Sequence, residues 1–171
     1  MIDENLHTLI NQTYNEKEDL AIFAIRQLKA YDSILKVERL IDIIEQNKSE
    51  KKVEYAIYSL ATTQPIKYVI KILLKQLYNK KEEICSIAAW LLSKYDIYIL
   101  PDLKNLLKNR KISMNDRKAL WLLGQIGGKD EIEFLDKLEF EDSEDLIFLI
   151  DDVKKTIIRK NVSLWFEKKN D

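Results

Sequence analysis

One short phrase recurs along this chain at an almost constant interval. It consists of an alanine followed mainly by apolar residues, and successive alanines lie 32, 32 and 31 residues apart. The four alanines are Ala24, Ala56, Ala88 and Ala119. A fixed period of this length is typical of proteins in which similar structural units stack in a line. Such a fold presents extended surfaces rather than one deep pocket.

Each interval has the pattern of two helices. The first helix carries the alanine phrase, and the second has apolar residues three and four positions apart, which places them on one helical face. In the second interval this stripe includes Val69, Ile70, Leu73 and Leu77. A small alanine side chain lets neighbouring helices approach closely. Three glycines and two prolines in 171 residues are too few for a sheet-rich fold, so the sequence predicts an all-α protein.

The period also predicts how the chain is organised. We expect one domain over residues 1–171, built as a right-handed α-solenoid of four to five helix pairs. Residues 1–14 are expected to form an N-terminal capping helix, residues 15–142 four repeats, and residues 143–171 a degenerate C-terminal cap. Within that cap, the segment 164–166 (Leu-Trp-Phe) either folds back as a lid or stays exposed for a partner.

Several residues mark the predicted helix ends. Ser113 and Asp116 have the spacing of a capping box. Asp96 is placed to cap the helix that follows it. The three glycines cluster at one turn, where the pattern predicts a positive φ: Gly124, Gly127 and Gly128.

Composition narrows the functional classes. The net charge is −1, so no global field attracts nucleic acid or anionic lipid. Cys85 is the single cysteine, and its apolar surroundings in the sequence predict a packed thiol. The first residues lack the basic segment and apolar run of a secretory signal, and no apolar stretch is long enough to span a bilayer. These features predict a cytoplasmic protein that does not enter the membrane.

The fourth unit resembles a known repeat. The run from Ala119 to Gly127 (Ala-Leu-Trp-Leu-Leu-Gly-Gln-Ile-Gly), followed by residues 131–138, is similar to the HEAT-like repeat first described in phycobilisome lyases. Residues 96–107, with the early Pro101, resemble the second-helix half. The resemblance covers roughly residues 16–160 and implies a bacterial α-solenoid. Proteins of this fold include scaffolds, immunity proteins of toxin systems and DNA alkylpurine glycosylases, so the fold alone assigns no role.

The resemblance makes one departure visible. The position two residues after the repeat alanine is usually polar, but here it is aromatic in three successive units: Tyr58, Trp90 and Trp121. Arg26 and Asp152 occupy the same position in the outer units. Because Trp and Tyr are favoured anchors in interfaces, this column is a candidate binding stripe. It can equally be buried between repeats or under Trp165, and the sequence leaves both readings open.

A second candidate surface is basic. Residues 67–118 hold twelve Lys and Arg against five Asp and Glu, whereas residues 130–152 hold eleven acidic residues against one lysine. The lysines at helical spacing are Lys67, Lys71 and Lys75 in one predicted helix and Lys104 and Lys108 in another. On the concave side of a solenoid they would form a strip that meets an acidic protein or a phosphate backbone. The alternative reading is ordinary solvation of a polar helix face.

The sequence offers little for catalysis. His7 is the only histidine, and no second member of a metal site or a nucleophile–base pair accompanies it. The glycine cluster lacks the Lys-Ser/Thr of a phosphate-binding loop. We therefore predict a non-catalytic protein–protein interaction module without cofactor or metal, of the immunity or adaptor kind. The alternative is a nucleic-acid-binding protein, similar to the DNA glycosylases, that uses the basic strip.

Overall fold

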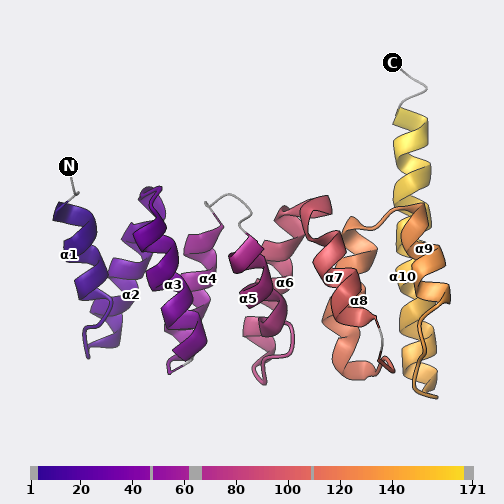
Figure 1. The fold of residues 1–171 in the computed structure, drawn as a ribbon, viewed down its shortest axis with the longest axis horizontal. Helices are drawn as coiled ribbons and strands as arrows, with labels where there is room; N and C mark the ends of the chain where they lie inside the picture. Colours follow the sequence, from indigo (N-terminus) through magenta and orange to yellow (C-terminus); the bar gives the residue numbers. More distant parts are fainter. Residues whose placement is uncertain (1–3, 47, 62–66, 109, 168–171) are drawn as a thin grey trace. The chain divides into compact units, whose positions relative to one another are not determined.

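The computed structural model describes residues 4–46, 48–61, 67–108 and 110–167, with the side chains of 161–167 outside the description. Within these residues the chain is helical and contains no β-strand, which confirms the all-α prediction (Figure 1). The chain divides into two compact units, Met1–Leu91 and Leu92–Asp171, and each is described by itself. The continuous solenoid and the single domain stay predictions.

The first unit contains one terminal helix followed by helix pairs. Its elements are α1 (Glu4–Gln12), α2 (Glu18–Gln27), the 3₁₀ turn η1 (Leu28–Ala30), α3 (Ile34–Gln46), α4 (Glu50–Leu60), α5 (Lys67–Gln76) and most of α6 (Glu82–Lys94). Figure 1 shows α1, α3 and α5 in one row, with α2, α4 and α6 in a second row behind it. Helix α4 packs against both α2 and α3. The helices thus alternate between two rows, as expected from the pairs in the sequence.

The repeated alanines lie where helices of this unit meet. Ala24 in α2, Ala56 in α4 and Ala88 in α6 are fully buried. One turn after Ala56, the buried Ser59 hydroxyl donates a hydrogen bond of 2.9 Å to the backbone carbonyl of Ile25. A short side chain on α4 can reach the α2 backbone only if the two helices are close. Alanine supplies the small surface that this approach requires.

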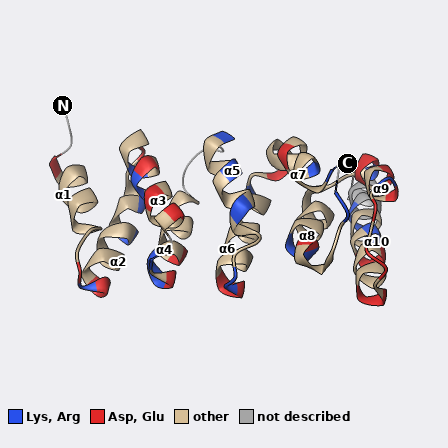
Figure 2. Ribbon diagram, turned by 60° about the horizontal axis from the view of Figure 1, so that its bottom comes forward, with Lys and Arg blue, Asp and Glu red and all other residues tan. Residues whose placement is uncertain are grey.

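Helices α2 and α6 are each preceded by the same local turn, in which an asparagine side chain accepts a hydrogen bond from the backbone two residues later. The side-chain oxygen of Asn15 accepts a hydrogen bond of 2.9 Å from the Lys17 backbone N–H just before α2. The corresponding bond from Lys81 to Asn79, just before α6, is 3.0 Å long. At the start of α4, Ser49 is instead the N-cap residue. Acidic and basic residues gather at these helix starts (Figure 2), so local polar chemistry defines where each first helix begins.

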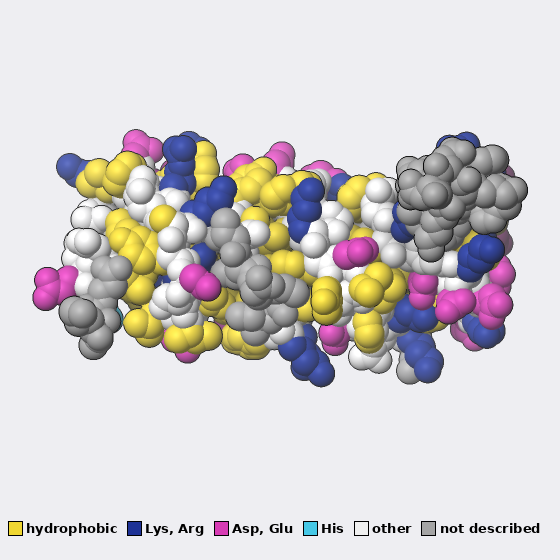
Figure 3. Space-filling model, turned by 90° about the horizontal axis from the view of Figure 1, so that it is seen from above, with side chains coloured by type: hydrophobic (Ala, Val, Ile, Leu, Met, Phe, Trp, Pro, Cys, Tyr) yellow, Lys and Arg dark blue, Asp and Glu magenta, His cyan; other side chains and the backbone are white. Residues whose placement is uncertain are grey.

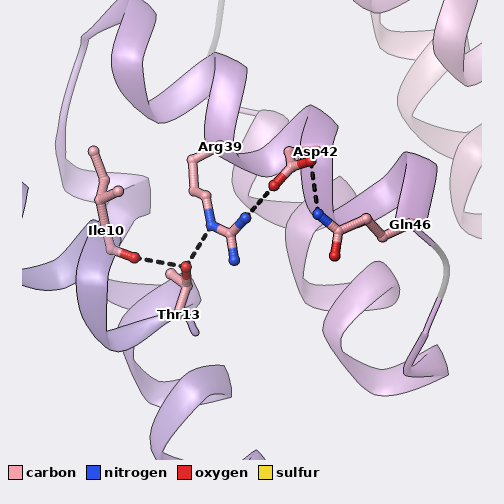
Figure 4. Close-up of polar contacts among 5 residues, drawn as sticks. All are labelled: Ile10, Thr13, Arg39, Asp42 and Gln46. Carbon is pink, nitrogen blue, oxygen red and sulfur yellow. Dashed lines mark hydrogen bonds and ion pairs between the residues drawn. The ribbon is translucent and has the colours of Figure 1, made fainter. Parts of the chain in front are cut away.

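A buried arginine joins α1 to α3 (Figure 4). The Arg39 Nε donates a hydrogen bond of 2.6 Å to the Thr13 hydroxyl, which itself donates to the Ile10 carbonyl at 2.7 Å. The Arg39 guanidinium also pairs with Asp42 and lies 3.5 Å from the centre of the Tyr14 ring. Arg39 is therefore a polar link that helps to hold the terminal helix on the first pair.

A second buried cation lies at the start of α3. Lys36 is almost fully buried, and its Nζ donates a hydrogen bond of 2.6 Å to the backbone carbonyl of Tyr31. Loss of hydration lowers the pKa of the Lys36 ammonium below its ordinary value of 10.5, and the nearby Asp32 carboxylate partly offsets this effect. Burial of this charge therefore makes folding stability sensitive to alkaline pH.

The sign of that dependence can be tested. Because the folded-state pKa of Lys36 is below the unfolded value, the unfolded chain binds more protons as the pH approaches 10.5 from below. We therefore expect the free energy of unfolding of the wild type to rise relative to Lys36→Met through this window. At pH values below the folded-state pKa of Lys36, the full cost of burying the charge remains. Urea unfolding at several pH values measures the difference, and the exposed Lys71→Met serves as control. A flat difference between wild type and Lys36→Met would contradict the prediction.

The second unit is built around a long C-terminal helix. Its elements are the 3₁₀ turn η2 (Asp96–Ile99), α7 (Leu100–Leu107), the 3₁₀ turn η3 (Met114–Asp116), α8 (Arg117–Ile126), α9 (Lys129–Asp136) and α10 (Glu144–Glu167). Helix α10 packs against α8 and α9, and α7 packs against α8. The repeat residue Ala119 is buried here, and so is Ile150, which follows it after 31 residues. Lys160 of α10 donates a hydrogen bond of 2.8 Å to the Gln125 carbonyl at the end of α8.

Local predictions in this unit had mixed outcomes. The Ser113–Asp116 capping box is confirmed, since the Ser113 N–H donates to the Asp116 carboxylate at 2.9 Å. The positive φ expected at the glycines is wrong, because no glycine in the described residues adopts one. A Cβ on Gly127 would instead lie 2.5 Å from the Leu123 carbonyl oxygen, so close approach requires glycine there. The cap expected from Asp96 is also wrong: Asp96 itself adopts a φ of 48°, and no side chain caps η2 or α7.

Candidate interaction surfaces

Two of the predicted aromatic residues form a pair on the first unit. Tyr58 of α4 and Trp90 of α6 have ring centres 5.7 Å apart and meet edge to face at 61°. The two residues remain 40% and 41% exposed. Their contact fixes the orientation of two large rings while leaving part of each accessible. For these two residues, the alternative that the column is buried is wrong.

The pair continues into a longer aromatic surface. The guanidinium of Arg26 on α2 lies 5.7 Å from the centre of the Tyr55 ring on α4, and Phe23 on α2 is also exposed. The aromatic stripe is hereafter the set Phe23, Arg26, Tyr55, Tyr58 and Trp90. The stripe crosses α2, α4 and α6, each the first helix of its pair. Residues one repeat apart occupy equivalent places on these neighbouring helices. Arginine, tyrosine and tryptophan are the residues most enriched in binding hot spots.

The third aromatic residue of the predicted column lies in the second unit. Trp121 of α8 is 42% exposed, so it too is a surface residue. A cover by Trp165 was one alternative for the column, but the side chains of segment 164–166 are outside the described residues. The lid reading of that segment therefore stays a prediction. Asp152, which continues the column on α10, is exposed as well.

The predicted basic residues fall into two different settings. Lys67, Lys71 and Lys75 are exposed along one face of α5 in the first unit, in agreement with ordinary solvation of that face (Figure 2). In the second unit, Lys108 is exposed, whereas Lys104 is part of an ion pair. The two lysines of α7 therefore have distinct roles.

A groove lies between α7 and α9 within the second unit. Its volume is about 930 Å³. The residues of α7 that line it follow helical spacing, as do those of α9. The lining residues are Leu100, Pro101, Lys104, Asn105, Lys108, Arg110, Glu131, Phe134, Lys137, Leu138 and Glu139. The surface therefore combines apolar side chains with several cations.

An ion pair joins the α7 and α9 sides of this groove. The Lys104 Nζ donates a hydrogen bond of 3.0 Å to one oxygen of Glu131, and it lies 5.1 Å from the centre of the Phe134 ring. The other oxygen of the buried Glu131 accepts a bond of 2.7 Å from the Gly128 N–H at the start of α9. The Glu131 carboxylate is thus held at both oxygens, and Lys104 neutralises it. Lys104 mainly joins α7 to α9.

The basic side chains concentrate at one end of the groove. Lys108 and Lys137 are the C-cap residues of α7 and α9, and both are exposed. Arg110 lies beside them and pairs with the buried Asp116. An isolated bridge between Ile112 and Phe140 joins the segments that follow the two helices. The described residues contain no carboxylate in an ion pair with Lys108 or Lys137.

Sequence reasoning missed a set of apolar residues at the turns between paired helices. Ile34 and Tyr68 are exposed in the first unit, and Ile97 and Tyr98 are exposed in the second. Figure 3 views the turn side of the protein and shows exposed hydrophobic side chains among charged ones. A signal was present, since Ile34, Ile66 and Tyr98 are each 32 residues apart. Ile66 lies outside the described residues.

Other candidate chemistry is sparse in the part of the chain that the structure describes. No group of three His, Cys, Asp or Glu residues there is arranged to hold a metal ion. His7 is exposed on α1, and the buried Cys85 thiol contacts the Asn79 carbonyl at 2.9 Å. Among the described helices, none combines the length and apolar character needed to cross a bilayer.

Comparison with known proteins adds no assignment to this geometry. Neither the family models nor the curated proteins include a match to this chain. The HEAT-like resemblance therefore rests on the repeat pattern itself.

Proposed function

We propose that this chain is a HEAT-like α-solenoid that acts as a non-catalytic protein–protein interaction module, in the manner of an adaptor or immunity protein. The observation that carries the proposal is the aromatic stripe of the first unit. Large rings cost little conformational entropy when they are buried by a partner, because few rotatable bonds are fixed. The contact between Tyr58 and Trp90 restricts these rings further before binding.

The stripe also has the composition of a binding surface rather than of solvated helix. Its apolar rings are flanked by one cation, Arg26, and they lie on helices rather than on loops. A site on helices keeps its geometry, so a partner meets a formed surface. The surrounding charged residues at the helix starts would form the polar rim that is usual around such a centre.

The proposal predicts that a partner is lost when the stripe is truncated. For the double variant Tyr58→Ala/Trp90→Ala we expect the amount of captured partner to fall about tenfold or more relative to the wild type. Two aromatic anchors of this kind commonly contribute more than a factor of ten to affinity. Quantitative mass spectrometry of proteins captured from a lysate of the source cells measures this. The dissociation constant of the purified complex then gives the fold-change directly.

A matched variant separates the stripe from general surface hydrophobicity. Tyr68→Ala/Phe148→Ala removes two exposed aromatic residues that lie outside the stripe. This control is expected to retain the same proteins as the wild type. Equal capture by the stripe variant, equal loss by the control, or no specific capture by the wild type would each count against the proposal.

Nucleic-acid binding is the weaker candidate function. Lys104, one of its predicted contacts, is engaged with Glu131, and acidic residues lie along α9 next to the basic groove (Figure 2). A phosphate backbone would meet these carboxylates along its path. An electrophoretic shift titration at low salt tests this candidate, and retardation at low protein concentration would favour it over the protein partner.

A further inference from the structure

The groove of the second unit has the features of a separate ligand site. At about 930 Å³ it is within the range of pockets that hold organic ligands, and much larger than a single phosphate or carboxylate requires. Phe134 and Leu138 supply apolar surface, while Lys108 and Lys137 supply positive charge at one end. The site therefore favours a ligand that offers both apolar groups and negative charge.

The basic residues that line the groove differ in whether they form ion pairs. Arg110 is paired with the buried Asp116, and Lys104 is paired with the buried Glu131. Lys108 and Lys137, in contrast, form no ion pair with any residue that the structure describes. Both extend from the C-cap positions of short helices into the same groove. Two lysines that line one groove, and that form no ion pair among the described residues, attract a ligand with more than one negative charge.

The groove is lined by both apolar and charged side chains, and this combination favours one class of ligand over the others. A nucleic acid carries a continuous row of phosphates, and the exposed Glu139 carboxylate in the lining would oppose part of that row. A small inorganic anion would leave the apolar part of the groove uncovered. An acidic peptide satisfies both parts, because its carboxylates can pair with the lysines while its aliphatic side chains cover Phe134 and Leu138.

We infer that the groove between α7 and α9 binds an acidic peptide segment of a partner protein, with carboxylates at Lys108 and Lys137 and an aliphatic side chain against Phe134. This inference rests on the proposed function in one respect, because both take the partner to be a protein. The groove belongs to a different unit from the aromatic stripe, and the ion pair of Lys104 with Glu131 keeps its two walls together.

Fluorescence anisotropy with the full-length chain tests the inference. The probe is a labelled peptide in which pairs of glutamates alternate with single leucines, and the reference is the same peptide with glutamine in place of glutamate. We expect saturable binding of the glutamate peptide, weakening with added salt, and no measurable binding of the glutamine peptide at the same concentrations. A labelled oligothymidylate of similar length represents nucleic acid.

Charge reversal locates the site. For Lys108→Glu/Lys137→Glu we expect the dissociation constant of the glutamate peptide to rise about tenfold or more. The control Lys67→Glu/Lys71→Glu changes the net charge by the same amount at exposed positions of the first unit. We expect it to change the dissociation constant of the glutamate peptide by less than about twofold. Glutamate at a helix C-terminus is itself unfavourable, so Lys108→Gln/Lys137→Gln, expected to weaken binding about threefold, is measured as well. Circular dichroism checks that each variant is folded.

Several results would overturn the inference. These are no binding of the glutamate peptide, equal binding of the glutamine peptide, or equal weakening by the groove and control variants. Tighter binding of oligothymidylate with the same dependence on Lys108 and Lys137 would assign the groove to nucleic acid instead. None of these outcomes involves Tyr58 or Trp90, so failure here is distinguishable from failure of the stripe experiment.

Discussion

Replacing Ala56 with leucine is expected to destabilise the protein by about 3 kcal/mol. Ala56 is fully buried on α4, a helix that packs against both α2 and α3. The hydrogen bond from Ser59 to the Ile25 carbonyl shows that α4 and α2 are close at this level. The larger side chain has no space there, so it must either separate the helices or adopt a strained rotamer. Separation would also break the Ser59 bond.

Guanidinium unfolding followed by circular dichroism measures this change. The matched control is Lys51→Leu, which introduces the same side chain at an exposed position of the same helix and is expected to change stability by less than about 0.5 kcal/mol. If Ala56→Leu were as stable as the control, the close contact between α2 and α4 would be wrong.

The second large effect is expected at Arg39. Truncation to alanine removes the stacking on Tyr14, the hydrogen bond to Thr13 and the ion pair with Asp42 together (Figure 4). It also leaves the buried Thr13 hydroxyl oxygen without its donor from Arg39. We expect a loss of about 2–3 kcal/mol, because a cavity and a lost charge-assisted hydrogen bond add. Arg39→Lys should recover only part of it, since an ammonium cannot stack and donate in the same geometry.

Hydrogen exchange identifies where this loss acts. The amides of α1 should exchange faster in Arg39→Ala, because Arg39 is a polar link between α1 and α3. Arg26→Ala is the control, as Arg26 is an exposed arginine whose guanidinium lies over the Tyr55 ring. Its effect on stability should stay below about 0.5 kcal/mol. Unchanged exchange in α1 would show that other contacts hold the terminal helix.

Much of the helical architecture was predictable, for a local reason. The positions of first and second helices follow from apolar periodicity and from the repeated alanine, which depend on neighbouring residues alone. The capping box of Ser113 and Asp116 was predictable on the same ground. The errors at Asp96 and Gly127 arose because backbone φ and the room for a Cβ depend on how the chain returns after the turn.

The candidate surfaces were predictable only in part. Periodicity identified Tyr58, Trp90 and Trp121, but which face of a first helix is exposed depends on packing, so burial stayed open. Lys104 was expected either on a basic binding strip or on a solvated helix face, and its ion pair was not foreseen because its partner Glu131 is 27 residues away in the sequence. The groove itself was not predicted, because it depends on the spacing between α7 and α9. Lys137 belongs to it although it is the one lysine within an acidic segment.

Asn15 and Asn79 each form the same kind of local turn, and these turns have a consequence for folding kinetics. Each turn closes between residues two positions apart and needs no contact from elsewhere in the chain. Structure of this kind can form before any helices pack, at little cost in loop-closure entropy. Among the residues that the structure describes, two equivalent initiation sites thus lie 64 residues apart, and refolding can nucleate at either of them.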